Sequence, residues 1–475
     1  MTSLGALLRD AGIDTELSGI AEELVVSTVE LDSRRCSPGS VFVCMPGTST
    51  TGEAFVSEAL ERGAICVVAS TPVDAPVTVR VERSALRGVL ASLSSAVVGN
   101  PAAELTLAGV TGTNGKTTVT WLLRGILSTA GYSSSTIGTL TGERTTPSAP
   151  ELHRELRVVA DRAAASSSRG AVAMEVSSHA LDQGRVDGLH FDVSVFTNLS
   201  HEHLDYHGTM ERYFDAKATL FDESRSGGAV ICVDDEWGTR LAARRTGPTR
   251  EVATAEAANI RSSIGATSFT WRSRSISTNL TGKVNVTNAM LALAAARELG
   301  LDEDDSTSAI AVVPPVPGRL EVVDLGTPSV LVDYAHTPVA LERVLRDLRS
   351  LDERRRLVVV FGCGGDRDRS KRPIMGSVAT RLADVVVVTS DNPRSEDPES
   401  IIDEILAGAD GAASIVREAD REVAIISAVT AARDDDVVVI AGKGHETTQE
   451  IAGTLVALDD RAVARVALDS RRPAC

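Results

Sequence analysis

A glycine- and threonine-rich segment, residues 112–118, has the residue types that bind the phosphates of a nucleotide. It reads Gly-Thr-Asn-Gly-Lys-Thr-Thr and follows an apolar run, residues 105–110, that predicts a buried strand. Glycines let successive backbone N–H groups point at phosphate oxygens, and a helix beginning at Lys116 adds partial positive charge. The Lys116 side chain can reach the β- and γ-phosphates, and the Thr117 hydroxyl can coordinate Mg²⁺. The strict P-loop pattern is not met, because Val110 stands where its first glycine belongs, so the loop is a variant.

Five of the eight histidines lie between residues 179 and 207, among several carboxylates. Glu175 ends an expected strand, which points it at the phosphate end of the sheet. Glu175 and a neutral His203 can hold Mg²⁺ beside the nucleotide, although Mg²⁺ prefers oxygen and a histidine ligand is unusual. A single histidine is more often a packing or surface residue. Lys217, in the helical stretch ERYFDAKATLF, is by its pattern a solvated helix lysine.

Strands and helices alternate along the chain and must position these residues. Apolar β-branched runs between helical patterns are typical of an α/β fold with mainly parallel sheets. Expected helices are 84–97 and 116–130, residues 268–271 predict antiparallel strands, and residues 314–318 (PPVPG) predict a hinge. Expected strands are 40–45, 64–69, 105–110, 171–176, 193–197, 229–233, 357–361, 385–389 and 437–441.

The last three of these strands each run into a polar or glycine-rich loop. In open parallel sheets, ligands bind outside the carboxyl ends of the strands. The loops after residues 361, 389 and 441 are therefore where a second ligand site is expected.

Composition limits the classes of function. The chain has 475 residues, which predicts about three domains. A net charge of −17 disfavours broad binding to nucleic acid or anionic membrane. No apolar run is long enough for a membrane span, and the first residues lack the order of a signal peptide. Six cysteines without metal-ligand spacing predict reduced thiols in a cytoplasmic enzyme.

Several further motifs, taken together, resemble the Mur ligase family, and within it the MurE type. They are GTNGKTT, TTPSA (145–149), MEVSSHAL (174–181), HLDYHGTMERYFDAK (203–217), PGRLE (317–321), VDYAHTP (332–338), GCGGDRD (362–368), DNPR (391–394) and GKGHE (442–446). GTNGKTT alone is shared with folylpolyglutamate and cyanophycin synthetases, but the set covers almost the whole chain. The resemblance implies three α/β domains: a UDP-sugar-binding domain (1–102), a central P-loop ATP-binding domain with a mainly parallel sheet (103–318), and a Rossmann-like amino-acid-binding domain (319–475).

The resemblance also implies roles for individual residues. The catalytic set is Lys116, Glu175, His203 and Lys217, and the Mg²⁺ set is Thr117, Glu175, His203 and Lys217, the last as a carbamate. ATP contacts are implied for Gly112, Thr113, Asn114, Gly115, Lys116, Thr117, Thr118, Asn285, Arg319, Asp333 and His336. UDP-sugar-peptide contacts are implied for Ser33, Thr145, Thr146, Ser177 and Arg185. Amino-acid contacts are implied for Arg367, Asp391, Asn392, Arg394, Gly442 and Glu446.

The activity implied is ATP-dependent amide-bond formation between meso-diaminopimelate and the D-Glu γ-carboxylate of UDP-MurNAc-L-Ala-D-Glu, by a monomer with Mg²⁺. Arg394 and Arg367 can receive the distal carboxylate that lysine lacks. Two alternatives stay open: the same ligase adding lysine or another diamino acid, and a non-catalytic nucleotide-binding paralogue. The chain departs from the family pattern at His201-Glu202, at Thr48-Ser49-Thr50 and at Val339.

Overall fold

The computed structural model describes residues 2–14, 19–47 and 50–471, which form two compact units. The first unit holds the described residues up to 254 together with 288–309. The second unit holds 255–287 and the described residues from 310 onward. Helix α10 (Val284–Glu298) begins in the second unit and ends in the first. Each unit is described by itself below.

The N-terminal part of the first unit is built on a parallel four-stranded sheet. Its order is β3 (Thr28–Glu30), β4 (Ser40–Val43), β5 (Ala64–Ala69) and β6 (Thr78–Arg80). Val41 and Val43 pack with α1 (Leu4–Asp10) and α3 (Leu86–Val97). Phe42 lies in the other core with α2 (Val56–Glu61). Side chains alternate along a strand, so one valine-rich segment serves two cores. β1 (Thr2–Ser3) and β2 (Val25–Val26) pair antiparallel.

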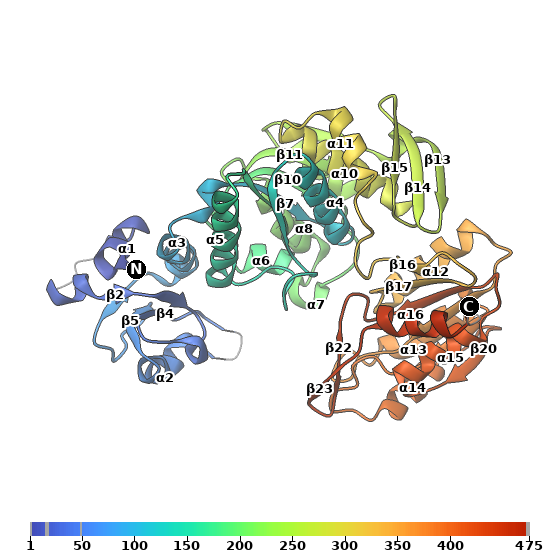
Figure 1. Cartoon of the computed structure of the whole chain (residues 1–475). Coiled ribbons are helices and arrows are strands. Elements are labelled where there is room, and N and C mark those ends of the chain that lie inside the picture. The colour runs from blue at the N-terminus through green and yellow to red at the C-terminus, as the bar shows by residue number, and fades with distance from the viewer. Residues whose placement is uncertain (1, 15–18, 48–49, 472–475) are drawn as a thin grey trace. The chain divides into compact units, whose positions relative to one another are not determined.

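The central part of the first unit is a parallel six-stranded sheet with helices on both faces (Figure 1). Its order is β12 (Thr249–Val252), β11 (Ser226–Cys232), β10 (Phe191–Phe196), β7 (Leu105–Thr111), β9 (Gly170–Glu175) and β8 (Ser133–Ile137). Its helices are α4 (Lys116–Thr129), α5 (Ala149–Ala165), α6 (Ser178–Asp182), α7 (Leu204–His207), α8 (Met210–Ala218), α9 (Glu236–Arg244) and α11 (Glu303–Ile310).

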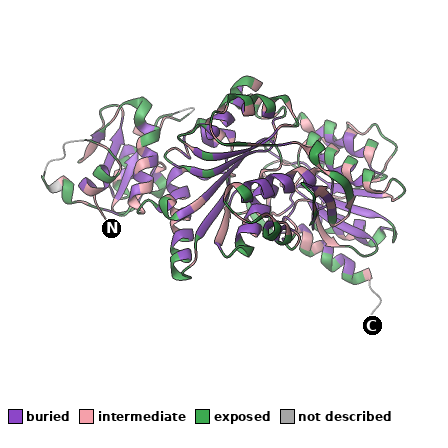
Figure 2. Ribbon diagram, turned by 90° about the horizontal axis from the view of Figure 1, so that it is seen from above, coloured by how far each residue is buried: buried purple, intermediate pink, exposed green. Residues whose placement is uncertain are grey.

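The strand order explains where this sheet offers a binding site. After β7 the chain forms β8 at the edge of the sheet and then β9 between β8 and β7. It then crosses to β10 on the other side of β7. The loop after β7 therefore lies at a topological switch point, where open α/β sheets bind ligands. The inner strands β7, β9, β10 and β11 are almost wholly buried (Figure 2), so the loops at their carboxyl ends carry exposed polar groups.

The second unit contains three sheets. β13 (Ala258–Ser263), β14 (Ala266–Trp271) and β15 (Arg274–Thr278) form an antiparallel meander. β22 (Thr448–Ile451) and β23 (Thr454–Ala457) form a hairpin. The main sheet has the order β16 (Glu321–Asp324), β17 (Ser329–Asp333), β21 (Val437–Ala441), β18 (Leu357–Phe361), β19 (Val385–Val388) and β20 (Ser414–Arg417), parallel except for β16.

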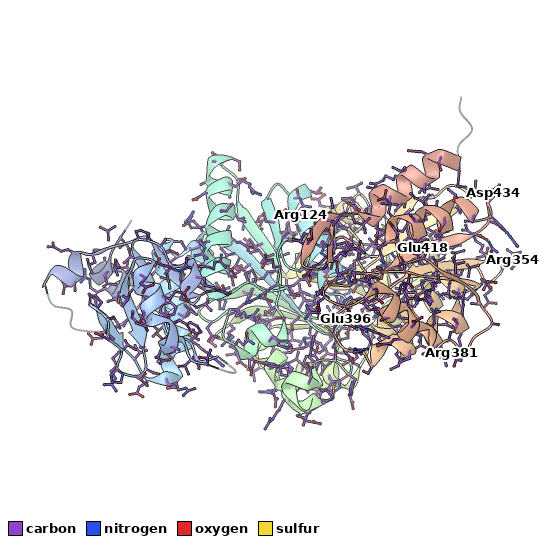
Figure 3. All side chains as sticks on the ribbon, turned by 90° about the horizontal axis from the view of Figure 1, so that it is seen from below. Arg124, Arg354, Arg381, Glu396, Glu418 and Asp434 are labelled. Carbon is purple, nitrogen blue, oxygen red and sulfur yellow. The ribbon has the colours of Figure 1, made fainter. Side chains whose placement is uncertain are left out.

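Helices cover both faces of that main sheet. One core contains α12 (Pro338–Leu351), α13 (Lys371–Leu382) and α14 (Pro398–Leu406). The other contains α15 (Arg421–Ala431) and α16 (Asp460–Arg471). Val359 belongs to the first core and its neighbours Val358 and Val360 to the second, as alternation in a strand requires. Charged side chains such as Arg354, Arg381, Glu418 and Asp434 project outward (Figure 3).

The predicted α/β class with mainly parallel sheets is confirmed. The expected strands appear as β4, β5, β7, β9, β10, β11, β18, β19 and β21, and the expected helices as α3 and α4. Residues 268–271 lie in an antiparallel sheet, as predicted. The sequence reading missed β8, whose Ser-Ser-Ser-Thr-Ile segment is too polar to resemble a buried strand, because it forms a sheet edge.

Two chain-wide expectations can be compared with the described residues. None of their helices is both long and apolar enough to span a membrane. Cys36, Cys44, Cys66, Cys232 and Cys363 are buried and not joined in disulfides.

Candidate functional site

The phosphate loop joins β7 to α4 and is held by the segment that follows β10. The Thr113 N–H donates to the Asn198 carbonyl (2.9 Å) and the Asn114 N–H donates to Asn198 Oδ1 (3.0 Å). The Lys116 ammonium donates to the carbonyls of Gly112 (3.0 Å) and Thr113 (2.9 Å), so it lies folded over the loop. Gly112 has a φ of 142°, and a Cβ there would clash with the Thr197 hydroxyl. The loop is thus pre-shaped before any ligand binds.

Glu175, at the end of β9, lies beside this loop as predicted. Thr117 Oγ1 donates to Glu175 Oε2 (3.0 Å), and the Thr139 N–H donates to Oε1 (2.9 Å). Glu175 is 2% exposed. Two oxygen donors of the kind Mg²⁺ prefers therefore lie within hydrogen-bond distance of each other.

Lys217, in α8, is not the solvated helix lysine that its local pattern predicts. Its side chain is 1% exposed, and Nζ donates to the Gly112 carbonyl (2.9 Å) and lies 4.7 Å from the Tyr213 ring centre. Burial, followed by the nearby positive charge of Lys116, lowers the pKa of Lys217 well below its usual value. The pattern misled because an amphipathic helix of nine residues shows which residues are polar, not which polar residue is turned inward.

The histidine cluster lies around α6, α7 and α8. The His203 ring lies 4.9 Å from that of His179 and 5.9 Å from that of Tyr213, measured between centroids. Desolvation by this packing lowers the pKa of His203, and the charges of Lys217 and Lys116 lower it further, which favours the neutral ring expected for a ligand. His207 has a packing and hydrogen-bonding role, because its Nε2 lies 3.0 Å from Ser178 Oγ.

The side chains implied for Mg²⁺ are those of Thr117, Glu175, His203 and Lys217. Within residues 2–14, 19–47 and 50–471 no group of three His, Cys, Asp or Glu side chains lies close enough to hold a metal. Thr117 and Glu175 supply two oxygens, and a further anion at Lys217 would complete a hard, oxygen-rich set. The residues present fit Mg²⁺ on the condition that Lys217 is modified.

The residues implied for the UDP-sugar peptide fall on two segments of the first unit, around Ser33 and around Thr145, and on the stretch from Ser177 to Arg185. The Thr146 hydroxyl donates to the Glu175 carbonyl (2.9 Å), and Arg185 donates to the Thr146 carbonyl (2.8 Å). Thr145 lies 3.3 Å from Thr139, hydroxyl to hydroxyl, and Ser177 caps α6. Ser33 is buried and donates to Glu58 (2.6 Å).

A hollow of about 500 Å³ lies between these two segments. Its lining includes Asp32, Arg34 and Arg35, which flank Ser33, and Arg144 and Ser148, which flank Thr145 and Thr146. The hollow is lined mainly by charged residues of both signs, which suits a polar ligand. Of the departing residues, Thr48 and Ser49 lie outside the described residues, while His201 and Val339 are exposed.

The remaining ATP residues lie in the second unit. Asp333, at the end of β17, accepts the N–H groups of Leu320 and Ala335 (both 2.7 Å), and burial raises its pKa. The Arg319 guanidinium lies 4.7 Å from the Tyr334 ring centre. His336 is exposed, with Nδ1 2.8 Å from the Tyr334 carbonyl. Asn285 is buried in α10 and donates to the Thr281 carbonyl (2.7 Å). The implied ATP set is thus divided between the two units.

The residues implied for the amino acid gather at the loops after β18, β19 and β21. Asn392 Nδ2 donates to Glu446 (3.0 Å). Gly442 has a φ of 116°, and a Cβ on it would meet the Asp391 carboxylate. A Cβ on Gly364 would lie 3.1 Å from Arg394 Nη1 and 3.7 Å from Arg367 Cγ, so both arginines lie beside this glycine.

Two buried cations at this site were missed by the sequence reading. Lys443 is fully buried and donates to Asn392 Oδ1 (3.1 Å), Glu446 (2.9 Å) and the Thr448 carbonyl (2.6 Å). Arg421 pairs with Asp460 (2.7 Å) and donates to the carbonyls of Ser390 and Ala441, each of which precedes a predicted site residue. Lys443 lay inside the GKGHE motif and could have been found there. Arg421, at the start of α15, carried no signal.

Comparison with known proteins gives one consistent result. Three family models match along the chain: "Mur ligase family, catalytic domain" over residues 25–109, "Mur ligase middle domain" over 110–296, and "Mur ligase, glutamate ligase domain" over 318–444. They support the three-domain organisation that the motifs imply.

Individual relatives match over nearly their whole length. Proteins named UDP-N-acetylmuramoyl-L-alanyl-D-glutamate–2,6-diaminopimelate ligase are similar to this chain. The one from Geobacillus kaustophilus is 44% identical over 94% of this chain and 95% of its own, and the one from Synechococcus elongatus is 42% identical over 96% of each. A solved structure with the same name aligns with a TM-score of 0.68 and 31% identity over 99% of both chains. The ADP complex of MurF from Thermotoga maritima shares the fold at a TM-score of 0.62 and 20% identity, with 94% of this chain and 98% of that chain covered.

Proposed function

This chain belongs to the Mur ligase family, and from that we propose that it joins meso-diaminopimelate to the D-Glu γ-carboxylate of UDP-MurNAc-L-Ala-D-Glu at the expense of ATP. The reaction would supply a peptidoglycan precursor. The observation that carries the proposal is the presence of two sites in one chain. One is a phosphate loop with Glu175 and a buried lysine, and the other is an amino-acid site with two arginines. A monomer in the cytoplasm, with domains at 1–102, 103–318 and 319–475, belongs to the same proposal.

The chemistry follows from what the substrates need. A carboxylate does not condense with an amine in water unaided. Its oxygen attacks the γ-phosphorus of ATP, the bond to the β-phosphate oxygen breaks, and ADP and an acyl phosphate result. The neutral amine then attacks the acyl carbon, phosphate leaves with the bonding electrons, and the amine loses its proton. The backbone N–H groups of residues 115–117, at the start of α4, and the Lys116 ammonium hold the phosphates and stabilise charge that develops on them.

Thr117, Glu175, His203 and a carbamate on Lys217 would hold Mg²⁺. Bound there, Mg²⁺ would neutralise negative charge on the phosphates. The carbamate forms when the neutral Lys217 amine bonds to the carbon of CO₂ and releases a proton. Burial favours the neutral amine, and the modification turns a desolvated cation into an anion.

Arg394 and Arg367 give the amino-acid site its preference for a second carboxylate. Both are close to Gly364, and a guanidinium can bind a carboxylate through two parallel hydrogen bonds. Lysine has no distal carboxylate and would leave these charges without that partner.

The test is a substrate panel with purified protein. ADP and phosphate should form only when UDP-MurNAc-L-Ala-D-Glu, Mg²⁺ and meso-diaminopimelate are all present, and the product mass should equal the tripeptide. Faster turnover with lysine or ornithine would move the assignment to the same ligase with another amino acid. Nucleotide binding without turnover would support the non-catalytic paralogue, and turnover with a folate and glutamate would reject the proposal.

A further inference from the structure

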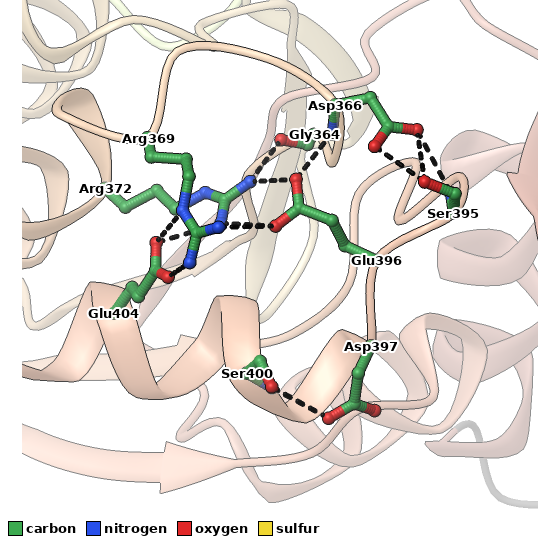
Figure 4. A network of polar contacts seen from close by, with 9 residues as sticks. All are labelled: Gly364, Asp366, Arg369, Arg372, Ser395, Glu396, Asp397, Ser400 and Glu404. Carbon is green, nitrogen blue, oxygen red and sulfur yellow. Dashed lines mark hydrogen bonds and ion pairs between the residues drawn. The ribbon is translucent and has the colours of Figure 1, made fainter.

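Arg372 is a fully buried arginine that none of the motif-based roles includes. It is the second residue of α13, and its side chain has no solvent-exposed surface. Nη2 donates to the Gly364 carbonyl (3.2 Å) and to Glu396 Oε1 (2.8 Å), while Nη1 donates to Glu396 Oε2 (2.9 Å) and Glu404 Oε2 (2.9 Å). Figure 4 shows the guanidinium lying between the two carboxylates. A buried charge of this kind is costly unless it is paired, and both terminal nitrogens bind carboxylates here, while Nε has no hydrogen-bond partner.

The partners of Arg372 belong to the two loops that carry the amino-acid site's arginines. Gly364 precedes Arg367 in the loop after β18, and Glu396 follows Arg394 in the loop after β19. The Arg394 guanidinium donates to the Gly365 carbonyl (2.8 Å), next to the Gly364 carbonyl that Arg372 holds. Successive carbonyls of one loop are therefore bound by two different arginines.

The loops also bind each other directly. The Asp366 N–H donates to Glu396 Oε1 (2.6 Å), the Ser395 hydroxyl donates to Asp366 (2.7 Å), and the Gly365 N–H donates to the Asn392 carbonyl (2.9 Å) (Figure 4). A Cβ on Gly365 would clash with the Pro393 carbonyl, so the backbones touch. Glu396 connects the two loops, because Arg372 donates to both of its carboxylate oxygens and Oε1 also accepts the Asp366 N–H.

We propose that Arg372 is a positioning residue for amino-acid specificity: through Glu396 and the Gly364 carbonyl it fixes the two loops so that Arg367 and Arg394 converge on the distal carboxylate of the incoming amino acid. The inference rests on the proposed function and deepens it. Arg372 does not touch the substrate; it sets the distance between residues that do. The planar guanidinium is essential, because a single ammonium cannot bind both Glu396 oxygens and the carbonyl in this geometry.

The network is ionic at all working pH values. Hydrogen bonds from Arg372 are the main cause that lowers the pKa of Glu396 to about 2, with the Asp366 N–H next. The ion pair between Arg372 and Glu396 is therefore insensitive to pH in the range where a ligase operates, and only a change of side chain removes it.

Three variants test the role. Arg372→Lys keeps the charge but loses the bidentate grip, and Glu396→Gln keeps the shape but loses the charge. Arg369→Gln is the matched control: Arg369 pairs with Glu404 and, more distantly, with Glu396 (3.9 Å), is 64% exposed and donates to neither loop backbone. For each variant one measures KM for diaminopimelate, ATP and UDP-dipeptide, the ratio of turnover with diaminopimelate to that with lysine, and the melting temperature.

The expected result is a rise of about 10- to 100-fold in KM for diaminopimelate in Arg372→Lys and Glu396→Gln. KM for the other two substrates should stay within about twofold. The preference for diaminopimelate over lysine should fall, and Arg369→Gln should match wild type. Unchanged KM for diaminopimelate, or an equal loss for all three substrates with a lowered melting temperature, would overturn the proposal.

A second readout needs no substrate. Amide hydrogen exchange at Asp366 should accelerate in Glu396→Gln and in Arg372→Lys but not in Arg369→Gln, because the Asp366 N–H donates to the carboxylate that Arg372 fixes. Equal exchange in all variants would show that Arg372 does not hold the loop. Wild-type protein that ignores diaminopimelate would instead refute the proposed function, while the exchange result would still decide the role of Arg372.

Discussion

Lys217 shows how far the meaning of one residue depends on its burial. A helix lysine in water is an ordinary solubilising cation, but this one is 1% exposed and donates to a phosphate-loop carbonyl. A buried cation without a carboxylate partner opposes folding. Such a cost is retained where a residue serves function, and the function we propose for Lys217 is that of a carbamate.

Replacing Lys217 by methionine should separate activity from stability. Lys217→Met removes the buried polar amine while keeping the length of the side chain, so we expect turnover to fall by at least about 10³-fold and the melting temperature to stay equal or rise. High bicarbonate should not restore activity. Arg212→Met, at an exposed position of the same helix, is the control and should retain full turnover. Near-normal activity of Lys217→Met would reject the carbamate.

Arg394 can be tested at the same scale. Arg394→Ala should lower kcat/KM for diaminopimelate by about 10²-fold, since a charge-assisted hydrogen bond is worth about 1.5–3 kcal/mol, and should leave KM for ATP unchanged. Arg417→Ala, an arginine that pairs with Glu399 and Asp403 elsewhere in the second unit, controls for loss of a surface charge. Steady-state kinetics with both amino acids measures the effect. A loss equal for lysine and diaminopimelate would mean that Arg394 does not read the distal carboxylate.

At the scale of elements, most of the candidate site residues lie at or just after the carboxyl ends of strands. β7, β9, β18, β19 and β21 each end directly before a candidate residue or loop. Apolar β-branched runs predicted these strands, so the loops after them were also predictable. Edge strands such as β8 were not, because their residues are only partly buried and their sequence is polar.

The phosphate loop depends on Gly112. Gly112→Ala places a methyl group against the Thr197 hydroxyl at a φ of 142° that alanine rarely adopts, and we expect loss of nucleotide binding with destabilisation of about 1–3 kcal/mol. Gly88→Ala in α3 is the opposite case: nothing lies within 4 Å of its Cβ, so it should stabilise by up to about 1 kcal/mol. Calorimetric titration with an ATP analogue and urea unfolding distinguish the two. Normal binding by Gly112→Ala would contradict this account of the loop.

Helix α5 carries a buried histidine that makes stability depend on pH. His153 is 1% exposed, and desolvation lowers its pKa from 6.5 to about 4. Between those values the unfolded chain binds a proton that the native state does not, so stability falls as pH falls. The loss between pH 7 and pH 5 should be about 2 kcal/mol from this residue. In urea unfolding, His153→Leu should lose less of its free energy of unfolding between pH 7 and pH 5 than the wild type does. The same pH dependence in both proteins would refute this role of His153.

For the whole molecule, we propose that the two compact units divide the substrates between them. All residues implied for the UDP-sugar peptide lie in the first unit, and all those implied for the amino acid lie in the second. The ATP set is split, with the phosphate loop in one and Arg319 and Asp333 in the other. Each unit has its own hydrophobic cores, so each can unfold by itself.

Calorimetry should therefore resolve two thermal transitions with different ligand responses. The UDP-dipeptide should raise only the first unit's transition and diaminopimelate only the second's, by about 2.7 kcal/mol at 100 times Kd. A non-hydrolysable ATP analogue with Mg²⁺ should raise both. Transitions can be assigned with the destabilising Gly112→Ala variant, which should lower the first alone. A single transition raised equally by every ligand would contradict independent units.

The sequence by itself determined the fold class, most strands, the phosphate loop and the family, because apolar periodicity, glycine placement and motif order are local properties. Tertiary structure alone decided which polar side chains are buried. Lys217, Arg421 and Arg372 look like ordinary surface cations along the chain, yet each is almost fully buried against carbonyls or carboxylates of distant segments. The burial of a charge depends on which strands and helices pack together, and no window of sequence contains that information.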